Sequence, residues 1–274
     1  MLKLLLFVVL SYGAVVAFMY GAQTTMIFPG TRLPSRPLDH PYTPLRLVIE
    51  REDGIQLRGL HFSPDDGSES DGLLIGFGGN AQDAEILGQE LAQSFPQLDV
   101  VVFHYRGYGD SGGKPSETAL FTDADAIYDK LVADLSPASV YAIGLSLGSG
   151  VAGHLSKTRP LDGVFLITPY DSIEAVATQA YPWLPVKLLL KHRFRTIDAM
   201  ADNQTPVAII AAGNDKVIRP ERTEVLRAAV ERLVFDHTVL DADHADLYAR
   251  PAYNQALRQA LDALKSVSGA PSSS

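Results

Sequence analysis

The sequence contains one short motif whose residue types and spacing indicate nucleophilic catalysis. Residues 144–148 read Gly-Leu-Ser-Leu-Gly, a G-x-S-x-G pattern that follows an apolar run and precedes a segment rich in small residues. A serine on such a sharp strand-to-helix turn exposes its hydroxyl beyond the carboxyl ends of the strands, where open parallel sheets bind their substrates. We therefore predict that Ser146 is a nucleophile. The alternative interpretation is a glycine-rich turn with no nucleophile, such as one that binds a phosphate.

A serine hydroxyl becomes a good nucleophile when a base removes its proton, and histidine is the expected base. The chain has seven histidines. Six fall in a proline-rich segment or within predicted strands and helices: His40, His61, His104, His154, His192 and His237. Only His244 lies in a loop directly after the last predicted strand, in the sequence Asp-Ala-Asp-His-Ala-Asp. We predict that His244 is the base.

The third group required is a carboxylate that orients the imidazole and stabilises its protonated form. Asp215 directly follows the apolar run 206–212, so that the chain order is Ser146, Asp215, His244, as in one large class of serine hydrolases. We predict that Asp215 is this carboxylate. Rival carboxylates lie after the preceding strand or beside the histidine, where they would also suit turn or helix capping: Asp171, Asp241, Asp243 and Asp246.

The oxyanion that forms when the serine attacks needs backbone N–H donors already in place, each contributing about 3 kcal/mol to lowering the barrier. One donor is expected from Leu147, directly after the nucleophile. The other is expected from Asn80, because the preceding Gly78-Gly79 lets the backbone approach closely. A plain glycine turn with Asn80 as the cap of the next helix is the alternative, and the two interpretations are compatible.

A second serine motif points elsewhere. Residues 109–113 read Gly-Asp-Ser-Gly-Gly, which matches the nucleophile sequence of chymotrypsin-like proteases. Those proteases are all-β, and their histidine and aspartate precede the serine. The helical periodicity of this chain contradicts that fold, so we do not expect Ser111 to be the nucleophile.

Apolar runs of strand length alternate with helical patterns from residue 45 onward. We expect strands at 45–50, 55–62, 72–77, 100–105, 139–145, 163–168, 206–212 and 232–240. This alternation predicts an α/β fold, a mostly parallel sheet covered by helices on both faces. The first two runs flank Asp53-Gly54, which predicts an antiparallel hairpin at one edge of the sheet.

The N-terminal segment differs from the rest of the chain. Residues 4–22 carry no charge over 19 positions, and a helix of that length roughly matches the ~30 Å hydrocarbon core of a bilayer. We predict a transmembrane anchor over residues 1–23, with the catalytic domain on the extracytoplasmic side. A cleaved signal peptide and a buried core helix are the alternatives. The next segment, 24–44, contains five prolines and is expected to be an extended connector.

The remaining organisation follows from length and composition. Residues 45–267 are expected to form one domain, with 173–199 inserted as a lid and 268–274 as a disordered tail. The net charge is −9 and basic residues form no block, which argues against nucleic acid as a partner. The chain has no cysteine, which excludes disulfides, thiolate metal sites and a cysteine nucleophile. We expect no metal or organic cofactor.

A longer stretch carries a family resemblance. The sequence YRGYGDSGGKPSE (105–117) resembles a branch of the α/β-hydrolase superfamily that includes membrane-anchored lysophospholipase-like and depalmitoylase-like enzymes. The similarity extends to GFGGN (76–80), GLSLGSG (144–150), TPYDS (168–172) and GNDKVI (213–218), and so covers roughly residues 45–250. It implies the α/β-hydrolase fold and hydrolysis of esters or thioesters, often of lipids. The family's oxyanion loop usually reads His-Gly-Asn, and Gly78 replaces that histidine here.

Together these features predict a serine hydrolase that cleaves an ester, thioester or amide through an acyl-enzyme on Ser146. The insertion 173–199 combines aromatic and aliphatic residues with a cluster of basic ones, which favours a lipid-like or acyl ester as substrate. The leucines of this insertion could instead simply pack over the sheet. An aminopeptidase-like amidase and a catalytically inactive, membrane-tethered binding protein are the alternative functions.

Overall fold

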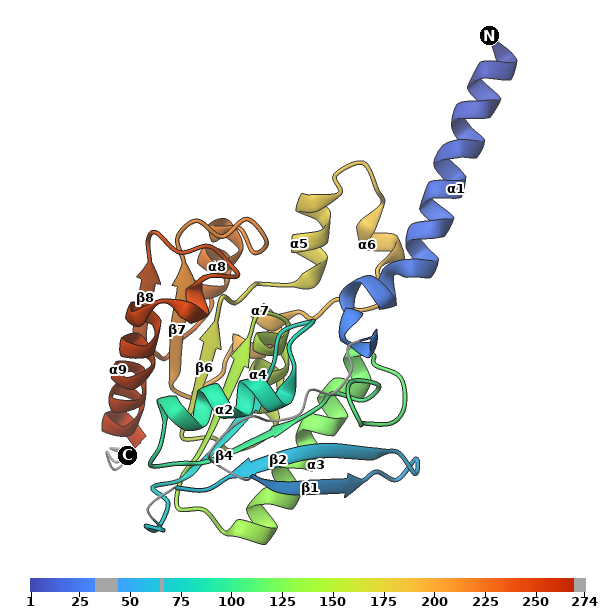
Figure 1. The fold of residues 1–274 in the computed structure, drawn as a ribbon. Helices are drawn as coiled ribbons and strands as arrows, with labels where there is room; N and C mark the ends of the chain where they lie inside the picture. The colour runs from blue at the N-terminus through green and yellow to red at the C-terminus, as the bar shows by residue number, and fades with distance from the viewer. Residues whose placement is uncertain (33–43, 65–66, 269–274) are drawn as a thin grey trace.

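The computed structural model describes residues 1–32, 44–64 and 67–268, and within these residues eight strands form a single sheet (Figure 1). In chain order the strands are β1 (Leu45–Glu50), β2 (Gln56–Phe62), β3 (Leu73–Phe77), β4 (Asp99–Phe103), β5 (Val140–Leu145), β6 (Gly163–Ile167), β7 (Val207–Ala212) and β8 (Leu233–Val239). Their order across the sheet is β1-β2-β4-β3-β5-β6-β7-β8. The first two strands form the predicted antiparallel hairpin, β2 pairs antiparallel with β4, and all later pairs are parallel.

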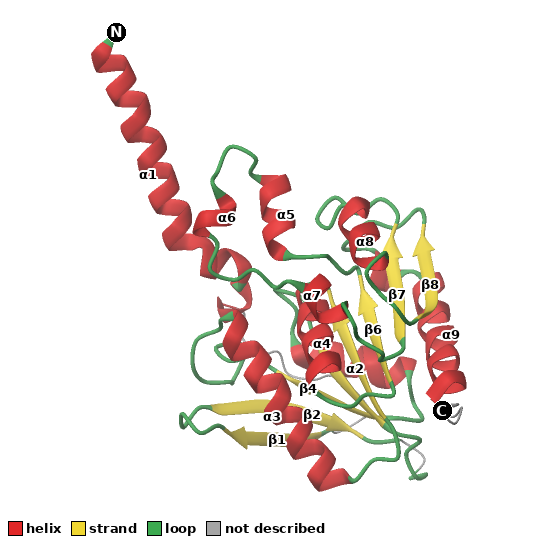
Figure 2. Cartoon of the chain, turned by 180° about the vertical axis from the view of Figure 1, so that it is seen from behind, coloured by secondary structure: helices red, strands yellow, loops and turns green. Residues whose placement is uncertain are grey.

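Helices cover both faces of this sheet, as the alternating pattern predicted (Figure 2). One face packs against α3 (Glu117–Leu135), α4 (Leu147–Thr158) and α8 (Pro220–Arg227), and the other packs against α2 (Ala84–Ser94) and α9 (Pro251–Ser268). Every residue of β3, β5, β6 and β7 is buried, because strands covered on both faces contact no water. The fold class predicted from the sequence is therefore confirmed.

The chain leaves this core between β6 and β7. There it forms α5 (Ile173–Ala180), α6 (Val186–Leu189) and α7 (Thr196–Met200). Helices α5 and α6 stand beyond the carboxyl end of β6 and above the rest of the sheet (Figure 1). The two helices and the loop between them occupy the insertion that the sequence predicted as a lid, and we call residues 173–199 the lid from here on.

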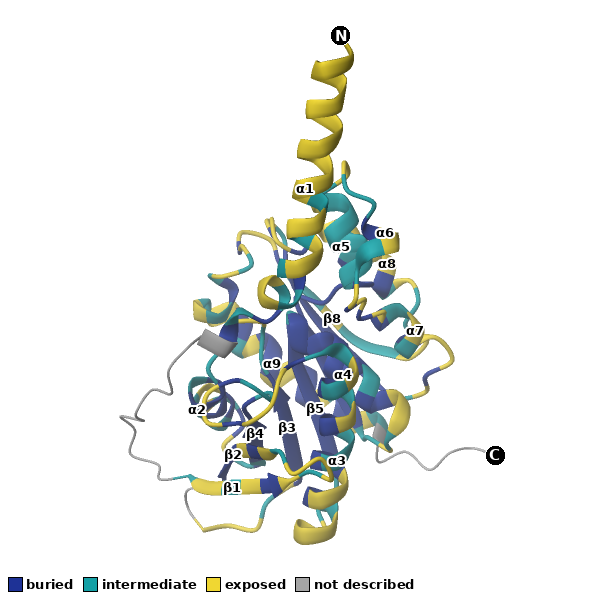
Figure 3. Ribbon diagram, turned by 90° about the vertical axis from the view of Figure 1, so that its right-hand side faces the viewer, coloured by how far each residue is buried: buried dark blue, intermediate teal, exposed yellow. Residues whose placement is uncertain are grey.

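The N-terminal helix α1 (Leu2–Ile27) projects away from the body of the molecule, and its first turns are exposed on all sides (Figure 3). Its most apolar 18-residue stretch has a mean hydropathy of 2.2 and none of that stretch is buried. The helix is thus long and apolar enough to cross a membrane. It continues four residues past the boundary predicted at residue 23, into the segment predicted as an extended connector, and a short 3-10 helix follows at Pro29–Arg32.

The rest of that connector, residues 33–43, lies outside the described residues, as do the tail residues 269–274. Helix α9 ends at Ser268, the first residue of the predicted tail.

Candidate active site

The predicted nucleophile lies on a tight turn between β5 and α4. Ser146 has φ 50° and ψ −114°, a backbone conformation that costs energy for a residue with a side chain. The flanking glycines are required by close contacts: a Cβ at Gly144 would lie 2.2 Å from the Gly148 carbonyl oxygen, and one at Gly148 would lie 2.1 Å from the Phe77 carbonyl oxygen. The G-x-S-x-G pattern therefore holds Ser146 at the point where β3, β5 and α4 meet.

The structure brings the three predicted side chains into one hydrogen-bonded row. His244 Nε2 lies 3.0 Å from Ser146 Oγ, and His244 Nδ1 lies 2.6 Å from Asp215 Oδ2. Asp215 follows β7 and His244 follows β8, so all three come from the carboxyl ends of parallel strands. In this arrangement the imidazole can accept the serine proton at one nitrogen and donate its N–H to the carboxylate at the other.

The carboxylate of Asp215 is itself held in place. It is buried, and its Oδ1 accepts the backbone N–H groups of Val217 and Ile218 at 2.8 and 2.7 Å. Only Oδ2 is left to contact His244. Fixed backbone donors on one oxygen therefore orient the other oxygen towards the imidazole.

The rival aspartates have other partners. Asp171 pairs with Arg222 at 3.0 Å. Asp243 accepts the N–H groups of Ala245 and Asp246 and so shapes the loop that carries His244. Asp246 in turn accepts the N–H of Asp243 and pairs with Arg250, while Asp241 pairs with Arg250 at 3.5 Å. The last three carboxylates thus build the loop around the histidine, and no contact of any of the four with its ring is found among the described residues.

The two predicted oxyanion donors lie on adjacent segments. Leu147 is the first residue of α4, where helix N–H groups have no partner within the helix. The loop with Asn80 passes close to Ser146, since a Cβ at Gly79 would lie 3.7 Å from the serine Cβ. Among the described residues, neither the Leu147 nor the Asn80 N–H has a hydrogen-bond acceptor. Both donors are therefore available to an incoming oxygen.

Two tyrosines that sequence reasoning gave no role support this loop. Tyr105 donates its hydroxyl to the Gly78 carbonyl at 2.9 Å, and Tyr108 donates to the Asn80 carbonyl at 2.8 Å. Burial raises the pKa of both phenols, so both remain protonated donors at neutral pH. Both tyrosines belong to the YRGYG stretch, which indicated the family resemblance but did not predict which groups the tyrosines would contact.

Gln82 lies where the family's usual histidine is replaced by Gly78. The side chain of Gln82 lies beside this glycine, and its Oε1 accepts the Gly79 N–H at 3.0 Å. Gln82 thus adds a third side-chain hydrogen bond to the loop, beside those of the two tyrosines.

Ser111, the serine of the second motif, has a different environment. Its side chain is buried, its hydroxyl donates to the His104 carbonyl at 2.9 Å, and it accepts the Arg58 N–H at 2.8 Å. The bond with Arg58 ties the loop after β4 to β2, and the bond with His104 lies within that loop. The hydroxyl is therefore committed to backbone groups within the fold.

The lid is tied to the core near the nucleophile. Tyr170, just before the lid, donates its hydroxyl to the Leu147 carbonyl at 3.0 Å. Glu117 accepts the N–H groups of Arg193 and Phe194 at 2.6 and 2.8 Å. The basic cluster of the lid is partly neutralised, because Arg193 pairs with Glu174 and Arg195 pairs with Asp198. The lid is thus less cationic than its sequence alone indicates.

No group of three or more histidine, aspartate or glutamate side chains in the described part of the chain could hold a metal ion.

Comparisons with known proteins agree with this architecture. Residues 73–191 match the family described as the alpha/beta hydrolase fold. A solved structure of the Pyrococcus furiosus esterase Pf2001 is similar with a TM-score of 0.66 at 17% identity, covering 86% of this chain and 99% of that one. At this identity the likeness shows the fold alone.

Sequence relatives include one protein named as a membrane protein and others named as lipases. An uncharacterised protein of Mycobacterium tuberculosis (strain H37Rv) is 36% identical over 67% of this chain and 66% of its own length, so the match spans just under two thirds of that relative. An uncharacterised membrane protein of Saccharomyces cerevisiae is 27% identical over 75% of this chain and 76% of its own length. The lysophosphatidylserine lipase ABHD12 of Xenopus tropicalis is 29% identical over 59% of this chain and 49% of its own length.

Proposed function

The chain belongs to the α/β-hydrolase superfamily, and we propose that it is a membrane-anchored serine hydrolase that cleaves an ester or thioester of a lipid-like substrate. The observation that carries this proposal is the row from Ser146 through His244 to Asp215, with distances of 3.0 and 2.6 Å. Such a row activates a serine hydroxyl, and its members occur in the chain order of this superfamily.

The proposed reaction has two halves. His244 Nε2 takes the proton of Ser146 while the serine Oγ bonds to the carbonyl carbon, and the carbonyl oxygen becomes an oxyanion held by the N–H groups of Leu147 and Asn80. Collapse of this intermediate breaks the bond to the leaving alcohol or thiol, which takes the proton from His244. Water then attacks the acyl-serine, again with His244 as base, and releases the acid.

The lipid-like substrate class is supported by two regions outside the row. The lid presents exposed apolar side chains, with Trp183 52% and Leu188 84% exposed. The similar ABHD12 proteins are named as lysophosphatidylserine lipases. An exposed apolar lid surface is suited to contact with the hydrocarbon chain of a lipid substrate.

We further propose that α1 is a retained anchor with the catalytic domain on the extracytoplasmic side. A cleaved signal peptide has no reason to be bound by the mature protein. Here Gln23 donates to the Leu189 carbonyl at 3.1 Å and accepts the Lys191 N–H at 2.7 Å, and Thr24 lies 3.0 Å from His192. These contacts between α1 and the lid favour an anchor that stays with the enzyme.

Labelling with a fluorophosphonate probe tests the proposal. Full-length protein in membranes should react with the probe and release acid from acyl esters, and amides offered in parallel should be poor substrates. An enzyme that prefers aminoacyl amides would point to the peptidase alternative. A protein that neither reacts with the probe nor turns over any ester would overturn the proposal and leave a binding role.

A further inference from the structure

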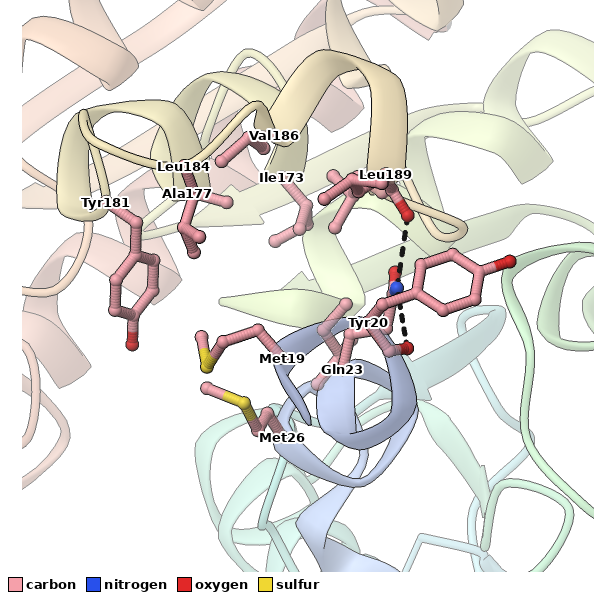
Figure 4. Close-up of a pocket in the computed structure, with 12 residues that line it drawn as sticks. Met19, Tyr20, Gln23, Met26, Ile173, Ala177, Tyr181, Leu184, Val186 and Leu189 are labelled. Atoms are coloured by element: carbon pink, nitrogen blue, oxygen red, sulfur yellow. Dashed lines mark hydrogen bonds between the residues drawn. The ribbon is translucent and has the colours of Figure 1, made fainter. Parts of the chain in front are cut away.

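An apolar groove separates the anchor helix from the lid (Figure 4). Helix α1 lines one side with Met19, Tyr20, Gln23, Met26 and Ile27, and the lid lines the other with Ile173, Ala177, Tyr181, Leu184, Val186, Leu189 and Leu190. The cavity measures about 110 Å³, comparable to apolar cavities of ~150 Å³ that bind a benzene-sized molecule. It can therefore hold a segment of a hydrocarbon chain.

The groove offers few free polar groups to a ligand. Gln23 is the one amide side chain in its lining, and both ends of that amide are already bound to backbone groups: Nε2 donates to Tyr20 O and Leu189 O, and Oε1 accepts from Lys191 N. The other lining residues are aliphatic, apart from Tyr20 and Tyr181 at opposite ends of the groove (Figure 4). A polar ligand would lose its hydrogen bonds to water without replacement, whereas a hydrocarbon would lose nothing.

The position of the groove along α1 indicates how near it lies to the lipid chains of a bilayer. Tyr12 donates its hydroxyl to the Trp183 carbonyl at 2.9 Å, so the outer end of the lid lies beside the middle of α1. Only ten residues of α1 precede Tyr12, which is ~15 Å of helix, about half of a ~30 Å hydrocarbon core. If α1 spans a bilayer, the uncharged end of the lid, residues 180–186, must therefore lie within the membrane. The groove begins at Met19, ~10 Å further along α1 than Tyr12, so its nearer end opens close to the edge of the hydrocarbon core.

We propose that this groove binds the acyl chain of a bilayer lipid, and that the anchor helix forms one wall of the substrate site. The proposal rests on the hydrolase function for its consequence in catalysis, but the binding of the chain does not depend on turnover. Hydrocarbon of the bilayer is the occupant because the groove is apolar, opens near the edge of the hydrocarbon core and is lined by the lid, which stands beyond the carboxyl end of β6 (Figure 1). Met19 and Met26 suit this role, since their flexible side chains adapt to chains of different shape.

The test fills the groove from the lid side. Ala177→Phe puts a ring into the cavity, and Ala180→Phe makes the same change at an exposed position of the same helix, outside the lining. With p-nitrophenyl esters in liposomes, we expect Ala177→Phe to lower kcat/KM for the palmitate about tenfold, the effect of excluding one or two methylene groups. Turnover of the acetate should stay within about twofold of wild type, and Ala180→Phe should change neither.

A second pair of variants approaches from the anchor, in case Ala177→Phe does not fold. Met19→Phe narrows the groove from α1, and Leu10→Phe alters an exposed position of the same helix outside the lining. The same selective loss of the long ester is expected for Met19→Phe only. Equal losses on both esters, or an unchanged chain-length profile in both groove variants, would overturn the proposal while leaving the hydrolase function intact.

Binding is measured separately from turnover in the Ser146→Ala variant. A non-hydrolysable ether phospholipid with a diazirine near the end of a palmitoyl-length chain should crosslink to peptides of both α1 and α5, and Ala177→Phe should suppress this crosslinking. Labels on the outer face of α1 alone would overturn the proposal. So would a change from dimer to monomer on Ala177→Phe without a change in crosslinking, because a second copy of the chain would then be the occupant.

If esters of every length fail as substrates but the probe still crosslinks inside the groove, the hydrolase function fails and the lipid site stands. The two conclusions can therefore be separated by experiment.

Discussion

The turn that carries Ser146 and the groove between α1 and the lid are built in opposite ways. Around the serine, hydrogen bonds fix the polar side chains, as with the two backbone N–H groups on Asp215 Oδ1 and the contact of its Oδ2 with His244. In the groove, side chains 166 residues apart in sequence face each other across mostly apolar surfaces. The first arrangement positions reacting atoms to a fraction of an ångström, and the second selects for shape and hydrocarbon.

This contrast implies that substitutions at the serine turn should change the rate for all substrates, whereas substitutions in the lid should change the preference among them. The largest expected effect is that of Ser146→Ala, which removes the attacking oxygen. We expect turnover of every ester to fall at least ~10⁴-fold and fluorophosphonate labelling to disappear, while the melting temperature changes little. Ser111→Ala is the matched control and should keep its labelling. Labelling that survives Ser146→Ala would show that the nucleophile has been misassigned.

The next largest effect concerns Asp215. Asp215→Asn keeps the shape of the side chain but replaces the carboxylate that faces the His244 N–H, so the imidazole loses both its orientation and the stabilisation of its charged form. We expect kcat to fall roughly 10³- to 10⁴-fold on long and short esters alike. Asp243→Asn, in the same loop system but without a contact to the ring, should lower kcat far less. Similar losses in both variants would mean that the loop, and not the charge, is what matters.

The serine turn and the groove also differ in how well the sequence predicts their structure. The strands could be predicted because continuous apolar runs are typical of strands buried on both faces. The serine turn could be predicted because the atoms that require its glycines lie a few residues away along the chain or in the neighbouring strand. The membrane anchor was predicted to end at residue 23, and the helix α1 runs four residues further. The continuous apolar run gives way there to Gln23, Thr24 and Thr25, but helical structure needs no apolar side chains and continues to Ile27, shortly before Pro29.

The docking of α1 on the lid could not be predicted from the sequence. Gln23 looks like a polar residue at the end of a hydrophobic segment, and only the folded chain brings it to the Leu189 carbonyl and the Lys191 N–H. The support from Tyr105, Tyr108 and Gln82 was hidden for the same reason, since their partners are backbone carbonyl and N–H groups, which carry no sequence signal.

A smaller effect is expected where a side chain only positions the oxyanion loop. Tyr108→Phe removes the hydroxyl that holds the Asn80 carbonyl and keeps the ring in the core, so the Asn80 N–H should be less well aimed. We expect kcat to fall about tenfold with little change in KM, less than the ~10²-fold cost of deleting an oxyanion donor outright. Tyr128→Phe removes a similar bond, to the Pro160 carbonyl at 2.8 Å, far from the serine.

Both tyrosine variants should lose about 1 kcal/mol of unfolding free energy, which chemical denaturation would measure. Only Tyr108→Phe should lose activity. A parallel loss of kcat in Tyr128→Phe would mean that the effect reports general stability and not the aim of the loop.

The smallest loss of activity is expected from substitutions towards the outer end of the lid. This loss best separates the role of the lid from that of the serine turn. Trp183 and Leu188 are exposed, so replacing both with Ser removes no core packing, but it removes the apolar surface that would contact lipid. We expect a loss of about fivefold in kcat/KM for long-chain esters presented in liposomes and almost none for a soluble acetyl ester. Presenting the long ester in detergent micelles should reduce the difference, because the lid no longer needs to lie in a bilayer. Equal losses on acetyl and long-chain esters would show that this part of the lid is only structural. The outer end of the lid would then have no part in selecting the substrate.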